Sequence, residues 1–173
     1  CIEIAVPGKW GYRCTGMSFL NFMRVFLAAM NNGLDTMTGK TFHQGTGIFE
    51  DFSDLKDLMA AWTHQVEFYA KATVEIDTAV DRAIEELVPD ILCSAFVDDC
   101  ISRGKTIKEG GSVYDFISGL QVGIANLGNS LAAIKKLVYE DSIISKEVLS
   151  RNMKNNFEGQ EGERIRQMLL NRA

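Results

Sequence analysis

The chain begins with Cys1-Ile-Glu-Ile-Ala-Val-Pro-Gly-Lys-Trp-Gly-Tyr-Arg-Cys-Thr-Gly16, a stretch punctuated by residues that interrupt regular structure. Side chains alternate along an extended strand, so the Cys1 thiol and the Glu3 carboxylate would point to the same side. Its glycines let the backbone approach a ligand closely, because they carry no Cβ atom. The stretch therefore predicts a loop that presents a thiol and a potential general base to one substrate.

A buried helix is predicted directly after this loop. Apolar residues cover most sides of the segment 19–32, as expected for a helix surrounded by other elements. Ser18 would cap the start of this helix, and Gly33 would end it. The glycine-rich segment 33–47 is a loop by composition.

The longest helical pattern begins at Ser53 and repeats apolar residues at spacings of three and four as far as Ile84. Pro89 predicts a break after it. Strand patterns are scarce, so we expect a mostly helical chain with two or three short strands. Three further helices are predicted near the C-terminus, at about 124–139, 145–155 and 160–172.

A helix from Asp90 to Arg103 is predicted after the break, with Gly104 as its stop. Cys93 and Cys100 would share one face of it as small buried hydrophobes. The four cysteines of the chain contain no C-x-x-C pair, which argues against a disulfide scaffold or a structural zinc site. A reducing cytoplasm fits this pattern.

The composition, with 46% hydrophobic and 24% charged residues, is that of an ordinary globular protein. The net charge of -5 and the pI near 5.1 argue against a partner such as nucleic acid or an anionic membrane. No apolar run approaches the roughly 20 residues that a membrane span needs. Because the chain does not begin with Met and its functional-looking stretch is at its start, we expect a fragment of a longer protein.

The sequence gives little support for a cysteine hydrolase, a metal site or a phosphate-binding loop. A hydrolytic thiol needs an imidazole base, and neither His43 nor His64 lies in a recognisable motif. The same two histidines show no metal-ligand spacing, so no metal site is predicted. Gly119-x-x-x-Gly123 lacks the Gly-Lys-Ser/Thr ending of a phosphate loop. Two glycine-rich segments, 7–16 and 110–123, would either line a pocket or form ordinary surface connections.

The residues quoted at the start carry a family resemblance. Cys1-Ile-Glu3 followed by Val-Pro-Gly-Lys9 resembles the cysteine loop of glycyl radical enzymes, the family of pyruvate formate-lyase and glycerol dehydratase. Runs similar to the dehydratase branch follow in order: Asp98-Asp-Cys-Ile101, Lys108-Glu-Gly-Gly111, Tyr114-Asp-Phe116, Gly119-Leu-Gln-Val-Gly-Ile-Ala-Asn126 and Asn129-Ser-Leu-Ala-Ala-Ile-Lys-Lys136. Within the family the chain looks most similar to bacterial members labelled probable formate acetyltransferase or probable dehydratase.

The resemblance implies an α/β fold class, in which this chain is a mostly helical fragment of a ten-stranded β/α barrel. Residues 1–173 would form a single fragment of the catalytic barrel domain. The Arg-Val-x-Gly-Tyr motif of the C-terminal glycyl radical domain is absent from the sequence, so the fragment alone is expected to be inactive. Full-length members of this kind are expected to be homodimers.

The resemblance also implies a mechanism. A glycyl radical, installed by a separate radical S-adenosylmethionine activating enzyme, would take the hydrogen of the Cys1 thiol, and the thiyl radical would then take hydrogen from a small-molecule substrate. Glu3 would accept the proton of the substrate hydroxyl. No directly bound cofactor is expected, and the reaction would belong to anaerobic, cytoplasmic metabolism.

Two departures from the family bear on the reaction. Pyruvate formate-lyase has two adjacent cysteines, whereas Ile2 follows Cys1 here. Glycerol dehydratases carry a His-Asp pair where Cys14 and Thr15 stand, which disfavours glycerol and favours a bulkier or less hydroxylated substrate. Candidate substrate-binding residues are Cys14, Thr15, Tyr114 and Gln121. We therefore expect radical dehydration or elimination; the alternatives are a formate C-acetyltransferase or other C–C lyase, and a non-catalytic helical interaction domain.

Overall fold

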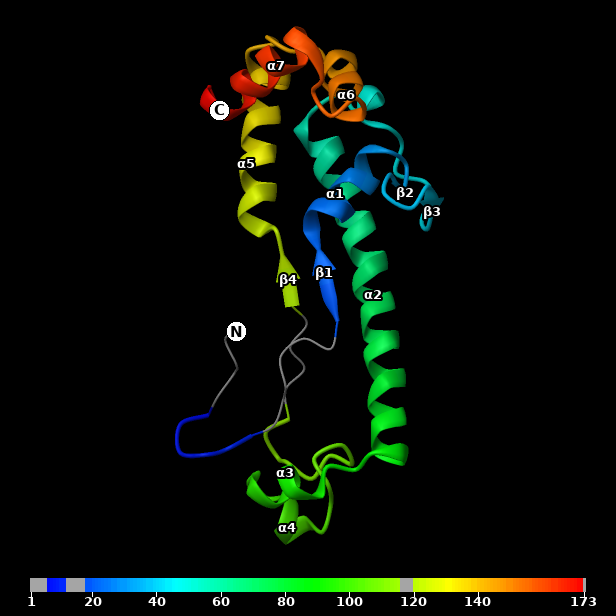
Figure 1. Cartoon of the computed structure of the whole chain (residues 1–173), viewed down its shortest axis with the longest axis vertical. Coiled ribbons are helices and arrows are strands. Elements are labelled where there is room, and N and C mark those ends of the chain that lie inside the picture. The colour runs from blue at the N-terminus through cyan, green and yellow to red at the C-terminus, as the bar shows by residue number, and fades with distance from the viewer. Residues whose placement is uncertain (1–5, 12–17, 116–119, 173) are drawn as a thin grey trace. The chain divides into compact units, whose positions relative to one another are not determined.

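The structure is a computed structural model that describes residues 6–11, 18–115 and 120–172. Helices make up most of the described chain, and its strands are two or three residues long (Figure 1). The chain divides into two compact units: a first unit of residues 1–20 and 70–121, and a second unit of residues 21–69 and 122–173. Every helix in the described ranges is too short or too polar to span a lipid bilayer.

The second unit is a cluster of helices around a hydrophobic core. Helix α1 (Phe22–Met30) contacts α5 (Ile124–Ile134), and α7 (Gly159–Asn171) contacts both α5 and α6 (Lys146–Lys154) (Figure 1). The largest fully buried apolar side chains of this core come from five segments: Phe49, Leu58, Leu137, Leu149 and Ile165. The three C-terminal helical segments lie close to the ranges that the sequence predicted.

Helix α1 begins at Phe22 rather than at Phe19. Residues Phe19–Asn21 form strand β1, which pairs with β4 (Leu120–Val122), so these residues are not available to a helix. The prediction of Ser18 as the cap is therefore wrong. The Asn21 side chain accepts hydrogen bonds from two backbone N–H groups of the first helical turn, at 3.1 and 3.2 Å.

The segment 33–47, predicted as a loop, contains a short antiparallel hairpin of β2 (Leu34–Asp35) and β3 (Lys40–Thr41). Gly33 precedes it with a φ of +82°, and its N–H donates to the Ala28 carbonyl at 2.7 Å, so it ends α1 as predicted. A side chain at this position would collide with the backbone of the following loop. A single turn, η1 (Phe49–Asp51), leads out of the segment.

The long predicted helix is α2 (Leu55–Leu87), which contributes residues 55–69 to the second unit and 70–87 to the first. Its first turn is capped by Asp54, whose carboxylate accepts the backbone N–H of Lys56 and Asp57 at 2.7 and 3.0 Å. The helix ends two residues before Pro89, as the sequence predicted.

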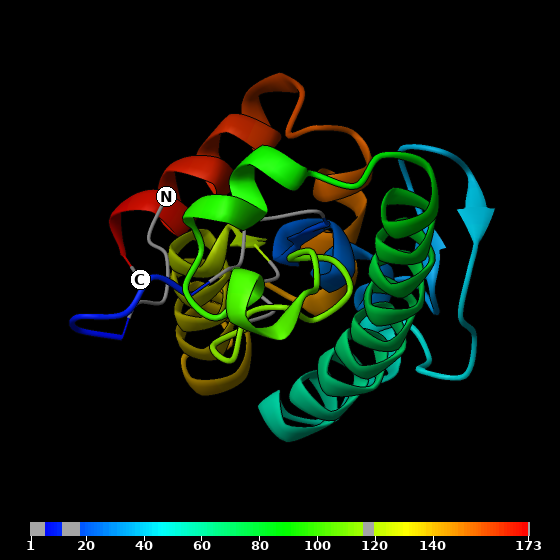
Figure 2. The same cartoon turned by 90° about the horizontal axis from the view of Figure 1, so that it is seen from below.

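The predicted single helix from Asp90 to Arg103 is wrong, because the structure contains two short helices, α3 (Ile91–Phe96) and α4 (Cys100–Arg103). They lie side by side in the first unit (Figure 2). Between them Asp99 has the left-handed φ of +76°, which a continuous helix does not permit. Gly104 closes α4 as predicted, with a φ of +62°.

The two cysteines of this region nevertheless meet in one small core. Cys100 is 2% exposed beside Val97 and Ile107, and the partly buried Cys93 packs against the same cluster. The sequence prediction of two buried hydrophobes is confirmed for Cys100. The prediction that one helix face joins them is wrong, since they come from two helices.

The C-terminal helical segment 124–139 changes its hydrogen-bonding pattern partway. Helix α5 passes at Ile134 into the π-helical turn η2 (Lys135–Glu140). The wider turn buries Leu137 and Val138 within the core of the second unit. Helix α6 then begins after Ser145, whose hydroxyl accepts a backbone N–H of the first turn at 3.3 Å.

Candidate active site

The predicted catalytic pair Cys1 and Glu3 lies outside the described residues, and so does the predicted substrate-binding pair Cys14 and Thr15. The structure describes the stretch between the two pairs, residues 6–11, and the elements of the first unit that hold it. It also describes the two remaining predicted substrate-binding residues, Tyr114 and Gln121.

Residues Val6 to Lys9 form a tight turn. The backbone N–H of Lys9 donates to the carbonyl of Val6 at 3.0 Å, and the two residues form an isolated antiparallel bridge. Gly8 has a φ of +76°, a conformation in which a side chain would be strained. The chain therefore reverses direction soon after the Cys1–Glu3 segment.

The turn is followed by a two-point attachment between Trp10 and Asp98. The backbone N–H of Trp10 donates to Oδ2 of Asp98 at 2.7 Å, and the backbone N–H of Asp98 donates to the carbonyl of Trp10 at 3.1 Å. This arrangement explains the break between α3 and α4. In a continuous helix the N–H of Asp98 would bind the carbonyl four residues earlier, whereas here it binds Trp10.

Gly11, the next residue, lies against Tyr114. A Cβ atom at Gly11 would collide with the carbonyl oxygen and the Cβ atom of Tyr114. The same carbonyl oxygen accepts the hydroxyl of Ser112 at 3.0 Å, so it is held in place from the other side. The half-buried Tyr114 is thus brought beside the described part of the cysteine loop, which makes it the best placed of the described candidates.

Ser18, the first described residue after residues 12–17, is bound to two other segments of the chain. Its hydroxyl donates to Oδ2 of Asp77 on α2 at 2.9 Å, and its carbonyl accepts the N–H of Leu120 at 3.2 Å. Asp77 is 8% exposed, and its Oδ1 is buried without a hydrogen-bond partner among the described residues. Gln121 follows Leu120 on β4 with an exposed side chain, so it lies on the strand that pairs with β1.

Hydrogen bonds and an ion pair hold in place the helices α3 and α4, between which Asp98 lies. The hydroxyl of Ser94 accepts the N–H of Ile107 at 3.0 Å, and the Arg103 guanidinium donates to the carbonyl of Gly111 at 3.1 Å. A further link joins this region to α2, where Lys108 forms an ion pair with Asp81 at 2.7 Å with its side chain only 5% exposed. We call residues 90–112 the platform of the loop.

The thiol of Cys100, one of two in this platform, is not suited to act as a nucleophile. Burial raises the pKa of Cys100 above its ordinary value, and the neighbouring Asp99 carboxylate acts in the same direction. The raised pKa keeps Cys100 as a neutral thiol, which is a poor nucleophile. Cys100 therefore packs the platform rather than serving as a second reactive sulfur.

The histidines lie together in the second unit, which the sequence did not reveal. The rings of His43 and His64 are 4.5 Å apart, and His43 stacks on Phe68 at the same centroid distance. They come from a loop and from α2, so no motif spacing could signal the contact. Among the described residues, no group of three or more His, Cys, Asp or Glu side chains is arranged to hold a metal ion.

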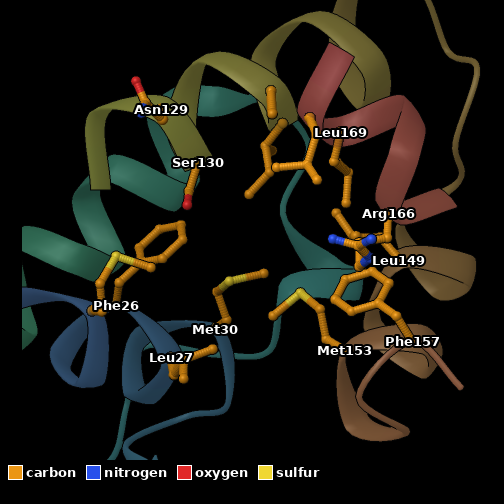
Figure 3. A pocket seen from close by; sticks show the side chains of 14 residues that line it. Phe26, Leu27, Met30, Asn129, Ser130, Leu149, Met153, Phe157, Arg166 and Leu169 are labelled. Atoms are coloured by element: carbon orange, nitrogen blue, oxygen red, sulfur yellow. The ribbon is translucent and has the colours of Figure 1, made fainter. Parts of the chain in front are cut away.

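A cavity of about 330 Å³ lies among α1, α5, α6 and α7 of the second unit (Figure 3). Its walls are mainly apolar, with Phe26, Met30, Met153, Phe157 and Leu169 among its lining residues. The guanidinium of Arg166 reaches it but binds the carboxylate of Glu163 at 2.8 Å. Neither Tyr114 nor Gln121, the predicted site residues that the structure describes, lines this cavity. The candidate active site therefore remains the loop of the first unit.

Comparison with known proteins gives matches along the whole chain. The family model described as pyruvate formate lyase-like matches residues 1–173. Probable dehydratase YbiW from Escherichia coli (strain K12) is 53% identical over 175 residues, which cover 100% of this chain and 22% of that protein. Trans-4-hydroxy-L-proline dehydratase from Clostridioides difficile is 31% identical over 163 residues, which cover 93% of this chain and 20% of that protein.

The fold is also similar to solved structures. The glycerol-bound form of the B12-independent glycerol dehydratase from Clostridium butyricum matches with a TM-score of 0.80 and 34% sequence identity, over 90% of this chain and 19% of that one. The chain thus spans about a fifth of the length of the relatives that it matches. Because the structural neighbours are glycyl radical enzyme barrels, the predicted fold class, a mostly helical part of such an α/β barrel, is confirmed. The chain belongs to the pyruvate formate lyase-like family of glycyl radical enzymes.

Proposed function

We propose that this chain supplies the cysteine loop of a glycyl radical dehydratase or eliminase that acts on a small hydroxylated substrate. The observation that carries the proposal is the Cys1-Ile-Glu3 sequence at the head of a whole-chain match to proteins named as dehydratases. The named substrates of two of these relatives, trans-4-hydroxy-L-proline and glycerol, are both small and hydroxylated. The active enzyme is the full-length protein that contains this segment.

The chemistry assigned to Cys1 and Glu3 follows from their side chains. A stored glycine radical, located outside this chain, supplies the unpaired electron of the cycle. Cys1, once its thiol hydrogen is removed, takes a hydrogen atom from the hydroxylated carbon of the substrate. Glu3 then accepts the proton of that hydroxyl, which the neighbouring radical centre makes more acidic. The hydroxyl of the adjacent carbon leaves as water, for which the proton accepted by Glu3 balances the charge. The product radical that remains takes the hydrogen atom back from the Cys1 thiol, which regenerates the thiyl radical.

The absence of a second cysteine next to Cys1 favours dehydration or elimination over carbon–carbon cleavage. A formate C-acetyltransferase carries its acyl group on a second thiol next to the first, and Ile2 occupies that position here. The buried Cys100 is no substitute, because it is not adjacent to Cys1 in the sequence and its side chain packs in the small core of the platform. The formate C-acetyltransferase reaction is therefore the second candidate, which a coenzyme A requirement would reveal.

We propose that Cys14, Thr15, Tyr114 and Gln121 contact the substrate. Tyr114 is supported by its contact with Gly11 of the loop, and Gln121 by its place on the strand that pairs with β1. Cys14 and Thr15 offer a thiol and a hydroxyl in place of the His-Asp pair of glycerol dehydratases. These weaker hydrogen-bonding groups suit a substrate with fewer hydroxyls or a bulkier body than glycerol.

The full-length enzyme would need a radical S-adenosylmethionine activating enzyme to install the glycyl radical, and we propose that it acts as a homodimer in the anaerobic cytoplasm. A thiyl mechanism supports this location, because the Cys1 thiol must stay reduced and carbon radicals react readily with oxygen. The segment itself contributes the loop and its support to this assembly.

The test uses the full-length protein, activated anaerobically and supplied separately with diols, amino alcohols, hydroxyprolines, and pyruvate with coenzyme A. We expect Cys1→Ala to abolish turnover while the glycyl radical signal in electron paramagnetic resonance persists. Product formation by Cys1→Ala would overturn the role of the thiol. Failure of the wild-type enzyme on every hydroxylated compound, with turnover of pyruvate and coenzyme A, would favour the acetyltransferase.

A further inference from the structure

Asp98 binds the cysteine loop through its side-chain carboxylate and through its backbone N–H. Its carboxylate accepts the N–H of Trp10 at 2.7 Å, and its own N–H donates to the carbonyl of the same residue at 3.1 Å. The first bond is charge-assisted, which makes it shorter and stronger than a bond between neutral groups. Asp98 thus binds Trp10 at two points, once through its side chain and once through its backbone, across 88 residues of sequence.

The position of Asp98 on the platform makes this attachment stiff. Asp98 lies between Val97 and the left-handed Asp99, and both Val97 and Cys100 are buried in the small core of the platform. Helix α3 is capped by Asp90, whose carboxylate accepts the N–H of Cys93 at 2.9 Å. Because its neighbours on both sides are fixed, Asp98 cannot follow the loop without disturbing this core.

The attachment also lies close in sequence to the reactive residues. Trp10 follows Glu3 by seven residues, and the Val6–Lys9 turn occupies most of the interval. Gly11, immediately after Trp10, is packed against Tyr114 with no room for a side chain. Displacing the peptide of Trp10 would therefore also disturb the contact between the loop and Tyr114.

We propose that Asp98 is a positioning residue for the Cys1–Glu3 segment, which it serves by fixing the point where the loop meets the α3–α4 platform. This inference rests on the proposed function of Cys1. Hydrogen-atom transfer requires the sulfur to lie close to the reacting hydrogen, and a misplacement of about 1 Å can cost on the order of 10²-fold in rate. A merely structural Asp98 would instead affect how much enzyme is folded and leave the rate of each activated molecule unchanged.

The experiment compares four variants of the full-length, anaerobically activated enzyme. Asp98→Ala removes the carboxylate acceptor, and Asp98→Asn keeps an uncharged acceptor in the same place. Asp90→Ala removes the cap of α3, so it weakens the platform without touching the loop. Asp99→Asn is the matched control at the neighbouring residue. It removes one negative charge, as Asp98→Asn does, and asparagine also adopts the left-handed conformation of Asp99.

The readouts are the glycyl radical content, kcat per radical, KM, and the deuterium isotope effect with substrate labelled at the abstracted position. For Asp98→Ala we expect normal radical content, kcat per radical lower by about 10- to 10²-fold, and a larger isotope effect, because hydrogen transfer becomes rate-limiting. Asp98→Asn should recover most of this loss. Asp90→Ala and Asp99→Asn should keep the wild-type kcat per radical.

An Asp98→Ala enzyme with wild-type kcat per radical would overturn the inference, as would a loss that Asp90→Ala reproduces. If Asp98→Ala fails to fold, Gly11→Ala provides the second route, since it displaces the loop from Tyr114 while Asp98 stays intact. It should show the same larger isotope effect, and Gly128→Ala, where nothing lies near the new Cβ atom, should not. Turnover by Cys1→Ala would instead contradict the proposed function itself, so the two failures are distinguishable.

Discussion

Two carboxylates near the loop, those of Asp98 and Asp77, accept hydrogen bonds from other parts of the chain. Asp98 accepts a backbone N–H from the loop, and Asp77 accepts the hydroxyl of Ser18. Both are engaged in holding the chain. Glu3, close to Cys1 in the sequence, is the carboxylate that we propose accepts a proton from the substrate.

Replacing Glu3 by glutamine should leave the full-length enzyme folded and activated but slow. The amide keeps the shape of the carboxylate and cannot accept the hydroxyl proton, and general-base assistance is typically worth about 10²–10⁴-fold in rate. Steady-state turnover per glycyl radical measures the effect. A Glu3→Gln enzyme as fast as the wild type would remove Glu3 from the mechanism.

Asp35 in the second unit provides a test of pH dependence. The hydroxyl of Thr38 donates to its carboxylate, and this bond, with further hydrogen bonds from the Arg24 guanidinium and the Met37 N–H, holds the pKa of Asp35 below its ordinary value of 3.8 despite burial. Because the folded-state pKa is depressed, the stabilisation is present above the unfolded-state pKa and is lost as the pH falls through the lower folded-state value.

The Asp35→Asn variant should therefore be less stable than the wild type at pH 7, and the difference should shrink below pH 3.8. Urea unfolding of both proteins across this range measures it. Asp51→Asn, an exposed carboxylate of η1, is the control and should show little change at either pH. A deficit for Asp35→Asn that stays constant into acid would show that the charge of Asp35 does not contribute.

At the scale of elements, strand β1 is anchored to α2 through the bond between Ser18 and Asp77. Replacing Ser18 by alanine leaves the buried Asp77 carboxylate without the hydroxyl donor, and an unsatisfied buried polar group costs about 1–3 kcal/mol, or more when charged. We expect Ser18→Ala to lower the free energy of unfolding by at least this amount in urea titration. Ser102→Ala, which removes an exposed hydroxyl, should have almost no effect.

The same elements show where periodicity predicts structure and where it fails. Helix α2 was predictable because its apolar spacing persists to Ile84 and Pro89 follows its end. The division between α3 and α4 was not predictable, because it depends on a contact between Asp98 and Trp10 that no local pattern records. Likewise the strand pairing of β1 with β4 overrode the helical pattern of the residues after Ser18.

At the scale of the whole molecule, the chain spans about a fifth of the length of its relatives, so the activity that we propose is that of a full-length enzyme containing this chain. We expect that activity to be independent of coenzyme A, because Ile2 replaces the thiol that would carry an acyl group. Product formation measured with and without coenzyme A tests this. A strict requirement for coenzyme A would favour the acetyltransferase candidate.

By itself the sequence determined the family, the candidate thiol and carboxylate, and most of the helices, because these depend on residues close together in the chain. Only the tertiary structure decided how the loop is held, since Asp98 lies 88 residues from Trp10 and Asp77 lies 59 from Ser18. Hydrogen bonds between such distant residues leave no periodic trace in a sequence. They form only when folding brings a backbone group and a carboxylate to within about 3 Å.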